Sequence, residues 1–324
     1  MKKNRVFHAL LFVGLAAMCI TGCGGTTDDA KANEEVNIPD SVDDDIVVTE
    51  NDAADGDESI VPGDSSEEES SVEATDEVTE EEISFEGRSL SILGDSISTY
   101  EGYIPYGLAV FYPAHGDVTD VSQTWWMRLL DDTGMELCSN GSSSGGTCIG
   151  DSLSADEPKY GCSDYRVSLL TGKEGKMPDV IIVYMGTNDL MLMAPMGDND
   201  GTKLVEEGVI ENFSDAYTMI LDKLESNYPA AQIYCCTLAQ VGDWGTDTPF
   251  VALTNGFGFT SEDYSKQIEI IAVNKGIPVI DLYHCGIEID NLQQTSTDGV
   301  HPTPTGMEYI EQAVLKGMGI TPDK

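Results

Sequence analysis

The order of apolar and polar positions divides the chain into three parts. Val6 to Ile20 are mostly apolar, and the segment from Gly24 to about Glu82 consists mainly of aspartate, glutamate, serine, threonine and alanine. From residue 84 onward, short apolar runs alternate with amphipathic stretches. This alternation predicts one domain over residues 84–324, in which strands and helices follow each other.

Within this domain, the apolar runs predict strands and the amphipathic stretches predict helices. The strands are expected at Ser89–Leu93, Met135–Ser139, Asp179–Tyr184, Gln232–Thr237 and Pro278–Asp281. The helices are expected at Gln123–Asp132, Tyr165–Leu170, Phe213–Asn227, Ser261–Asn274 and Pro304–Lys316. Because strands that alternate with helices form parallel sheets covered on both faces, the expected fold class is α/β, a three-layer α/β/α sandwich with a five-stranded parallel sheet.

The start of the chain is typical of an export signal. Basic residues precede the apolar run, which is shorter than a typical transmembrane helix. The run ends in Ile20-Thr21-Gly22-Cys23, which resembles the bacterial lipobox, whose cysteine is lipidated. We interpret residues 1–22 as a lipoprotein signal peptide and Cys23 as the lipidation site, so the protein is expected to be extracytoplasmic and lipid-anchored to the bacterial cell membrane. An ordinary secretory signal with a chance cysteine is the alternative.

The acidic segment limits what the chain can bind. Residues 23–83 offer few apolar side chains to offset the entropy of ordering, so we interpret them as a disordered tether. The whole chain has a net charge of −42 and a pI of about 4.1. This charge argues against nucleic acid as a partner and against adsorption to anionic lipid. The membrane is therefore expected to be a partner only through the N-terminal lipid.

The cysteines do not suggest a metal site. Six of them lie outside the signal and the lipidation site: Cys138, Cys148, Cys162, Cys235, Cys236 and Cys285. An exported location permits disulfides, and Cys148 with Cys162 is the preferred pair because both fall in one loop region. The sequence has no CxxC pair and no His/Cys cluster with zinc spacing, so neither a metal nor a cofactor is expected.

Four polar blocks follow strand ends or open a helix, so they can converge on one edge of the expected sheet. They are Gly94-Asp95-Ser96, Asn140–Thr147, Gly186–Asp189 and Asp298–His301. A serine needs a base to become a useful nucleophile, and the base needs a third group that fixes its tautomer. His301 suits the first role and Asp298 the second. Gly145, in a glycine turn, and the amide of Asn188 suit the stabilisation of an oxyanion.

In this order, the blocks resemble those of the SGNH (GDSL-type) hydrolases over about residues 84–320. The resemblance implies the flavodoxin-like strand order 2-1-3-4-5 and a serine ester hydrolase that forms an acyl-enzyme. It assigns Ser96 as nucleophile, His301 as base and Asp298 as its partner. The oxyanion donors it implies are the N–H groups of Ser96 and Gly145 and the side chain of Asn188.

The glycine block departs from the family pattern. This chain has Asn-Gly-Ser-Ser-Ser-Gly-Gly where many members have Asn-x-Gly-x-Ser-Gly, so Gly141 or Gly146 could replace Gly145 as donor. The classical α/β-hydrolases fit less well, because Ser98 stands where their second elbow glycine would be and the acid lies only three residues before the histidine. Three polar residues nearby have ordinary interpretations: Asp189 and His284 as structural residues, and His115 as an exposed loop residue.

An aromatic insertion between Ser96 and the first helix points to the substrate. Tyr103, Tyr106 and Trp125 could stack on sugar rings or line an acyl chain, although Trp125 and Trp126 could also pack in the core. Family members with such a loop are similar to carbohydrate-directed esterases. The expected function is therefore removal of short acyl groups, acetyl above all, from an acylated glycan. The alternatives are a lipase or lysophospholipase and a catalytically silent glycan-binding lipoprotein.

Overall fold

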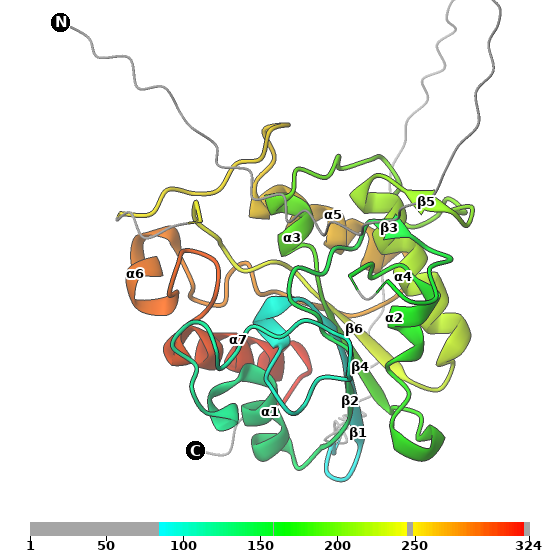
Figure 1. The fold of residues 1–324 in the computed structure, drawn as a ribbon, viewed down its shortest axis with the longest axis horizontal. Helices are drawn as coiled ribbons and strands as arrows, with labels where there is room; N and C mark the ends of the chain where they lie inside the picture. The colour runs from blue at the N-terminus through cyan, green and yellow to red at the C-terminus, as the bar shows by residue number, and fades with distance from the viewer. Residues whose placement is uncertain (1–83, 158, 245–248, 321–324) are drawn as a thin grey trace, which may run out of the picture. The chain divides into compact units, whose positions relative to one another are not determined.

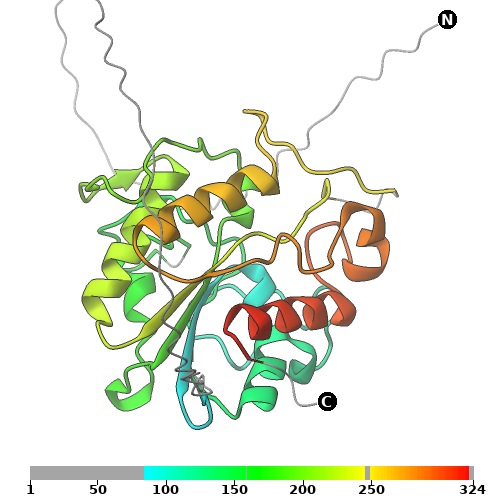
Figure 2. The same cartoon turned by 180° about the vertical axis from the view of Figure 1, so that it is seen from behind.

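A computed structural model describes residues 84–157, 159–244 and 249–320. Strands and helices alternate along this part of the chain and form three layers, as Figures 1 and 2 show from opposite sides. The expected signal peptide, the lipidation site Cys23 and the acidic tether lie outside the described residues.

The central layer is a five-stranded parallel sheet with the order β2-β1-β4-β6-β7. Its strands are β1 (Ser89–Gly94), β2 (Glu136–Asn140), β4 (Val180–Tyr184), β6 (Gln232–Cys236) and β7 (Val279–Ile280). Numbered along the chain within the sheet, this order is 2-1-3-4-5, so the expected fold class and strand order are confirmed. The residues of β1 and β4 are all buried, as expected of central strands with helices on both faces.

Helices cover both faces of this sheet (Figures 1 and 2). One face carries α1 (Trp125–Thr133) and α7 (Pro304–Gly317), which contact each other. The other face carries α2 (Asp164–Ser168), α4 (Phe213–Asn227) and α5 (Ser261–Asn274). All five predicted helices are therefore present. Over the described residues, no helix is long and apolar enough to cross a membrane.

Two helices have the predicted bounds because strong local signals mark their ends. The Asn212 side chain accepts a hydrogen bond from the backbone N–H of Asp215 at the start of α4, and Pro229 follows the end of that helix. Thr260 and Asp263 form a capping box at the start of α5. At these ends, the local signals in the sequence agree with the observed bounds.

The sequence did not predict the short elements. These are the antiparallel pair β3 (Gly150–Asp151) and β5 (Val209–Ile210), the helices α3 (Thr187–Met191) and α6 (Leu292–Thr295), and one-turn 3₁₀ helices at Ser96–Ser98, Val121–Gln123, Lys173–Gly175 and Ile289–Asn291. None of them is long enough to show an apolar period.

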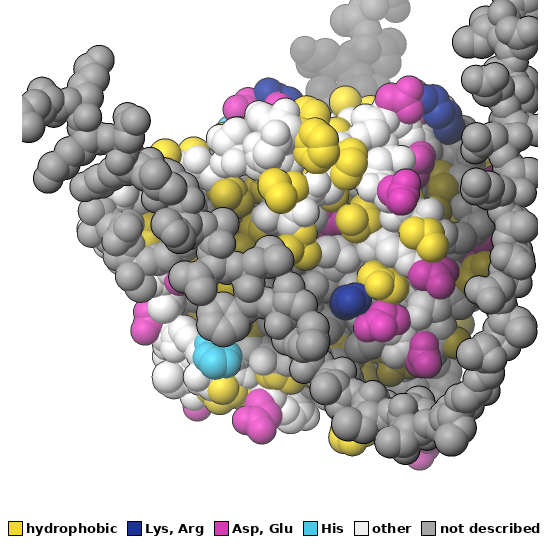
Figure 3. Space-filling model, turned by 45° about the horizontal axis from the view of Figure 1, so that its top comes forward, with side chains coloured by type: hydrophobic (Ala, Val, Ile, Leu, Met, Phe, Trp, Pro, Cys, Tyr) yellow, Lys and Arg dark blue, Asp and Glu magenta, His cyan; other side chains and the backbone are white. Residues whose placement is uncertain are grey.

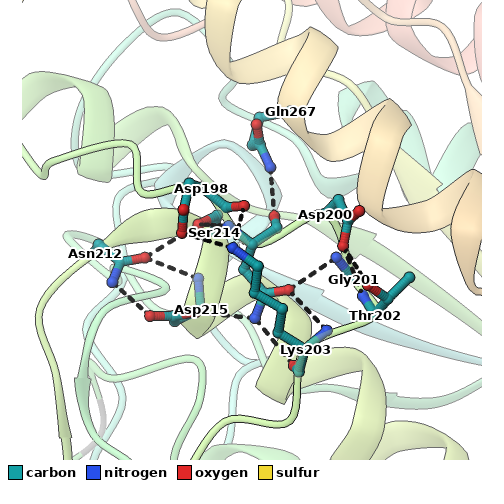
Figure 4. Close-up of polar contacts among 10 residues, drawn as sticks. Asp198, Asp200, Gly201, Thr202, Lys203, Asn212, Ser214, Asp215 and Gln267 are labelled. Carbon is teal, nitrogen blue, oxygen red and sulfur yellow. Dashed lines mark hydrogen bonds and ion pairs between the residues drawn. The ribbon is translucent and has the colours of Figure 1, made fainter. Parts of the chain in front are cut away.

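A polar cluster fixes the connection between α3 and α4 (Figure 4). Asn199 is buried, and its amide N–H₂ donates to Asp215 of α4 at 2.9 Å. Gln267 of α5 donates to the backbone carbonyl of Asn199 at 2.7 Å, and Lys203 pairs with Asp198 at 2.9 Å. The polar groups of this cluster are thus paired with each other, and the cluster attaches the loop to two helices.

The six cysteines of the domain are all free, so the expected disulfide between Cys148 and Cys162 is wrong. The shared loop region does bring the two backbones together, because the N–H of Cys162 donates to the carbonyl of Cys148 at 3.2 Å. Both thiols are buried, and burial raises the pKa of each above its ordinary value. The two residues therefore act as small apolar side chains of the core.

Candidate active site

Ser96 lies at the carboxyl end of β1, where it opens a 3₁₀ helix. The turn is tight: a Cβ on Gly94 would lie 2.6 Å from the hydroxyl oxygen of Ser142, so only glycine fits. The Asp95 side chain accepts the N–H of Ile97 at 3.0 Å and caps the helix. The fully buried Arg166 donates to the carbonyl of Gly94 at 2.9 Å. These contacts hold Ser96 in one position just beyond the carboxyl end of the central strand β1.

A chain of hydrogen bonds connects Ser96 to His301 and Asp298. His301 Nε2 lies 2.9 Å from Ser96 Oγ, and His301 Nδ1 lies 2.8 Å from Asp298 Oδ2. The other carboxylate oxygen of Asp298 accepts the backbone N–H groups of His301 at 2.8 Å and Val300 at 3.1 Å. With Nδ1–H donating to the carboxylate, Nε2 is free to accept the serine proton. The structure therefore brings together the three residues that the sequence singled out.

Buried charges near Ser96 have shifted pKa values. Burial alone would raise the pKa of the Asp298 carboxyl, but hydrogen bonds and the charge of His301 outweigh it and lower this pKa below its usual value. Burial raises the pKa of Asp95 to about 6, although the N–H of Ile97 and the charges of His301 and Arg166 act in the opposite direction. Asp298 is thus held as an anion, which stabilises a protonated His301.

Two backbone N–H groups are available beside Ser96. Within the part of the chain that the structure describes, the N–H groups of Ser96 and Gly145 donate to no protein acceptor. The alternative donors are occupied: the N–H of Gly141 donates to the carbonyl of Ile92 at 2.9 Å, and that of Gly146 to Ser143 at 2.9 Å. Gly145 adopts a φ of +70°, which favours glycine. The geometry therefore favours Gly145 over the other two glycines.

The amide of Asn188 lies next to this glycine turn. Its Nδ2 donates one hydrogen to the carbonyl of Gly146 at 3.0 Å, which leaves its second hydrogen available. The neighbouring Asp189 is fully buried and accepts the N–H groups of Cys148 at 2.8 Å and Ile149 at 3.1 Å. This confirms the structural role expected for Asp189, which joins the start of α3 to the glycine block.

The aromatic insertion only partly matches its expected role. Trp125 is fully buried and donates its indole N–H to Ser98 at 3.2 Å, so the expectation that it contacts substrate is wrong. It faces the core because it lies on the side of α1 that packs against the sheet. Tyr106 is fully exposed, and Tyr103 is partly exposed with its ring 5.3 Å from that of Trp126. For these two tyrosines, a contact with substrate stays a prediction.

Two aromatic residues that the sequence did not single out lie against the His301–Asp298 pair. The ring of Phe111 stacks on that of His301, with 3.6 Å between ring centroids and an interplanar angle of 11°. The indole N–H of Trp244 donates to Asp298 Oδ2 at 3.2 Å, and Trp244 is 67% exposed. Phe111 belongs to the aromatic insertion, which was a usable signal. Nothing in the sequence around Trp244 points to the site.

The two other histidines among the described residues, His115 and His284, lie on the surface. His284 is exposed and its Nδ1 lies 2.8 Å from Asp281, and His115 is exposed with its ring 5.4 Å from that of Phe111. Across the described ranges, no group of three or more His, Cys, Asp and Glu side chains is arranged to hold a metal ion.

The arrangement around Ser96 is suited to nucleophilic attack on a carbonyl carbon. Hydrogen-bond donors lie where they can stabilise the oxyanion that this attack produces.

Comparison with known proteins gives a consistent result. Residues 88–248 match the family model described as GDSL-like lipase/acylhydrolase. A solved structure described as a GDSL-like lipase from Bacteroides uniformis is 27% identical, and the match covers 72% of this chain and 96% of that one, with a TM-score of 0.51. Another solved structure, also described as a GDSL-like lipase, from Bacteroides ovatus, is 26% identical. The match covers 72% of this chain and 98% of that one, with a TM-score of 0.51.

A protein from Lactobacillus plantarum shares the fold at 23% identity, with a TM-score of 0.54, and the match covers 73% of this chain and 98% of that one. No curated protein matches the chain. The family model spans the Ser96, Gly145 and Asn188 blocks, and the structural matches span nearly the whole length of the two Bacteroides proteins. Residues 88–248 therefore belong to a GDSL-like lipase/acylhydrolase domain, and the chain is a carboxylic ester hydrolase.

Proposed function

We propose that this ester hydrolase removes short acyl groups, acetyl above all, from an acylated glycan through an acyl-enzyme on Ser96. The observation that carries the catalytic part of the proposal is the continuous chain of hydrogen bonds from Ser96 Oγ through His301 to Asp298. A buried serine and histidine with a partly buried carboxylate at these distances form the arrangement that activates a serine nucleophile.

The proposed reaction proceeds in two steps. Ser96 Oγ attacks the ester carbonyl carbon while its proton passes to His301 Nε2, and Asp298 stabilises the imidazolium that forms. The negative carbonyl oxygen accepts hydrogen bonds from Ser96 N–H, Gly145 N–H and Asn188. His301 then protonates the leaving alcohol. In the second step His301 removes a proton from water, which attacks the acyl-enzyme. His301 then returns that proton to Ser96 Oγ as the acid leaves.

Two features support a neutral, sugar-containing substrate. Exposed aromatic side chains lie in the insertion and in the loop that carries Trp244, and such rings can pack on the apolar face of a sugar. Figure 3 shows the upper side of Figure 1, where the loops beyond the strand ends lie. In its coloured part, hydrophobic side chains lie among many carboxylates and few basic groups. An acidic surface of this kind suits an uncharged glycan better than an anionic phospholipid.

The proposal also includes the location of the enzyme. Cys23 would carry the lipid anchor, and the acidic residues up to about residue 83 would hold the domain away from the membrane surface. The membrane is then a partner only through this anchor, and nucleic acid is not a partner, because the net charge of −42 would repel it.

Hydrolysis of 4-nitrophenyl acetate and 4-nitrophenyl octanoate by the wild type and Ser96→Ala tests this function. We expect faster hydrolysis of the acetate, and a loss of about 10⁴-fold or more in the variant because the nucleophile is gone. Ser142→Ala is the matched control: its hydroxyl is buried beside the same turn and, among the described residues, has no hydrogen-bond partner. It should retain activity.

The other outcomes identify the alternatives. A clear preference for octanoate would replace the glycan esterase with a lipase or lysophospholipase. Binding of acetylated glycan by a wild type that hydrolyses no ester would indicate the silent binding protein. Equal activity of Ser96→Ala and wild type would remove Ser96 from the mechanism.

A further inference from the structure

Trp244 lies beside the catalytic pair without belonging to any of the four polar blocks. It is on the loop between β6 and α5, it is 67% exposed, and its indole N–H donates to Asp298 Oδ2 at 3.2 Å. That oxygen is the one that accepts Nδ1–H of His301. Three hydrogen bonds therefore separate an exposed indole ring from the hydroxyl of Ser96.

The backbone around Trp244 holds it next to the turn that carries Asp298. Gly242 pairs with Ala252 in an antiparallel bridge, and the N–H of Gly242 donates to the carbonyl of Gly299 at 2.8 Å. The N–H of Asp243 donates to Val251 at 2.8 Å, and a Cβ on Gly299 would lie 2.8 Å from the carbonyl oxygen of Asp243. The loop and the turn thus approach each other as closely as their backbones allow.

The loop that carries Trp244 has further exposed apolar side chains on it or against it. Val251, which is bonded to Asp243, is exposed, and so is Phe257 further along the same loop. Met193, at the end of the helix that carries Asn188, is exposed and lies close to Gly256 of this loop. An indole whose polar N–H is already bonded and whose ring is largely exposed to water is suited to contact a ligand.

The chemistry of ester cleavage decides which part of the substrate lies there. The carbonyl oxygen must meet the donors at Gly145 and Asn188, whereas the oxygen of the leaving alcohol must come within hydrogen-bond distance of His301 Nε2. The alcohol part of the ester therefore lies on the His301 side of Ser96. Phe111 also lies on that side, but it is only partly exposed and one face of its ring is stacked on His301, whereas Trp244 is 67% exposed.

We propose that Trp244 is a positioning and specificity residue, whose N–H holds the Asp298 carboxylate and whose ring face receives the sugar that leaves as the alcohol. The second half of this inference rests on the proposed glycan substrate. The first half rests on the hydrogen bond alone and holds for any ester.

Kinetics of the full chain with three esters test the ring face. Ethyl acetate and glucose pentaacetate share the acyl group and differ in the alcohol, whereas ethyl octanoate differs from ethyl acetate in the acyl group. In Trp244→Ala, we expect KM for glucose pentaacetate to rise about tenfold more than KM for ethyl acetate, because only the sugar loses the ring. Trp244→Phe, which keeps an aromatic face, should retain most of the affinity for glucose pentaacetate.

Trp244→Phe tests the hydrogen bond, because it removes the indole N–H and keeps an aromatic ring. We expect kcat for ethyl acetate to fall about three- to tenfold with KM unchanged. In an Asp298→Ala background the same exchange should have no further effect, because its target is absent. A residue that only supports the fold would lower kcat by the same factor in both backgrounds.

Each possible result bears on one of the two claims. If the wild type cleaves glucose pentaacetate and Trp244→Ala leaves its KM unchanged, the ring-face role is wrong and the glycan esterase stands. A KM effect confined to ethyl octanoate would assign the ring to the acyl chain and overturn the role for the sugar. If the wild type cleaves ethyl acetate but not glucose pentaacetate, the glycan substrate fails and the sugar contact fails with it, while the kcat test still decides the hydrogen bond.

Discussion

The hydrogen bond between Asp298 and His301 is significant because of where it lies. The chain repeats the same spacing and the same 2.8 Å contact in Asp281 and His284. The side chains of the first pair are 18% and 8% exposed, whereas those of the second are 58% and 72% exposed. Only His301 reaches a serine hydroxyl and carries a stacked aromatic ring, that of Phe111. The surroundings, not the motif, distinguish a catalytic pair from a surface pair.

This contrast supplies a matched test of Asp298. In Asp298→Asn, the amide N–H₂ would face Nδ1 and favour the tautomer protonated at Nε2, which cannot accept the serine proton. We expect kcat for 4-nitrophenyl acetate to fall about 10³–10⁴-fold with little change in KM. Asp281→Asn should leave both constants unchanged. Equal effects of the two exchanges would mean that Asp298 does not orient His301.

Asp95 should make stability depend on pH. Its pKa of about 6 lies above the ordinary 3.8, so between these values the folded state binds more protons than the unfolded state. The free energy of unfolding contributed by Asp95 therefore falls as pH rises from about 4 to 6, by up to about 3 kcal/mol. Asp189, with a pKa also raised to about 6, acts in the same direction, whereas Asp298 stabilises the fold above its lowered pKa.

The difference between Asp95→Asn and wild type isolates this contribution. The asparagine Oδ1 can still accept the N–H of Ile97, but the side chain no longer titrates. Urea unfolding at pH 4, 5, 6 and 7 should show the variant gaining stability relative to wild type as pH rises. Parallel curves for the two proteins would show that Asp95 has no raised pKa.

At the scale of elements, the start of α7 fixes the turn that ends in His301. Thr303 caps this helix by accepting the N–H of Gly306 at 3.3 Å, and a Cβ on Gly306 would lie 2.2 Å from the carbonyl oxygen of Thr295, the last residue of α6. Because that contact is with backbone, it cannot be relieved by a side-chain rotation. The two helices can approach this closely only at a glycine.

Gly306→Ala should therefore destabilise the protein even though alanine favours helices. We expect a loss of about 2–3 kcal/mol in the free energy of unfolding, together with lower activity because the His301 turn moves with the helix. The neighbouring exposed Thr305→Ala is the control and should have a small effect. Chemical denaturation of both variants measures the difference, and equal stabilities would show that α6 and α7 can separate at no cost.

The predictability of an element depended on its length and its ends. Phe213–Asn227 and Ser261–Asn274 could be predicted because each has several turns of apolar period and a clear cap. The helix α3 could not, because five residues beginning Thr-Asn-Asp have no period. Trp244 could not be assigned to the site either, because it lies in a long loop whose path depends on backbone contacts with distant segments. The aromatic insertion pointed to the region of Phe111, but the sequence did not show that this ring stacks on His301.

At the scale of the whole molecule, strand order assembles the site. Ser96, Gly145 and Asn188 follow β1, β2 and β4, and they meet because β1 lies between β2 and β4 in a parallel sheet. His301 comes from the turn before α7. The blocks at these residues could be read from the sequence, and their order carried the resemblance to the family. Their distances depend on the register of the strands, which the sequence alone does not specify.

The same organisation predicts where the chain can be shortened. Phe85 is buried in the core, the N–H of Gly87 donates to the carbonyl of Gly134 at 2.9 Å, and the carbonyl of Arg88 accepts the N–H of Glu136 at 2.9 Å. A chain that begins at Ser84 keeps all three contacts, and one that begins at Ser89 loses them although β1 is complete. We expect the longer chain to match the full chain in melting temperature and in ethyl acetate hydrolysis.

The chain that begins at Ser89 should be less stable by at least about 3 kcal/mol, since loss of a buried phenylalanine alone costs about that much. Urea unfolding of the two truncated chains beside the full chain measures this. If the chain that begins at Ser84 is itself unstable or inactive, residues before 84 contribute to the fold and the acidic segment is more than a spacer. If both truncated chains match the full chain, the contacts of Phe85 and Gly87 contribute little, and the domain begins at β1.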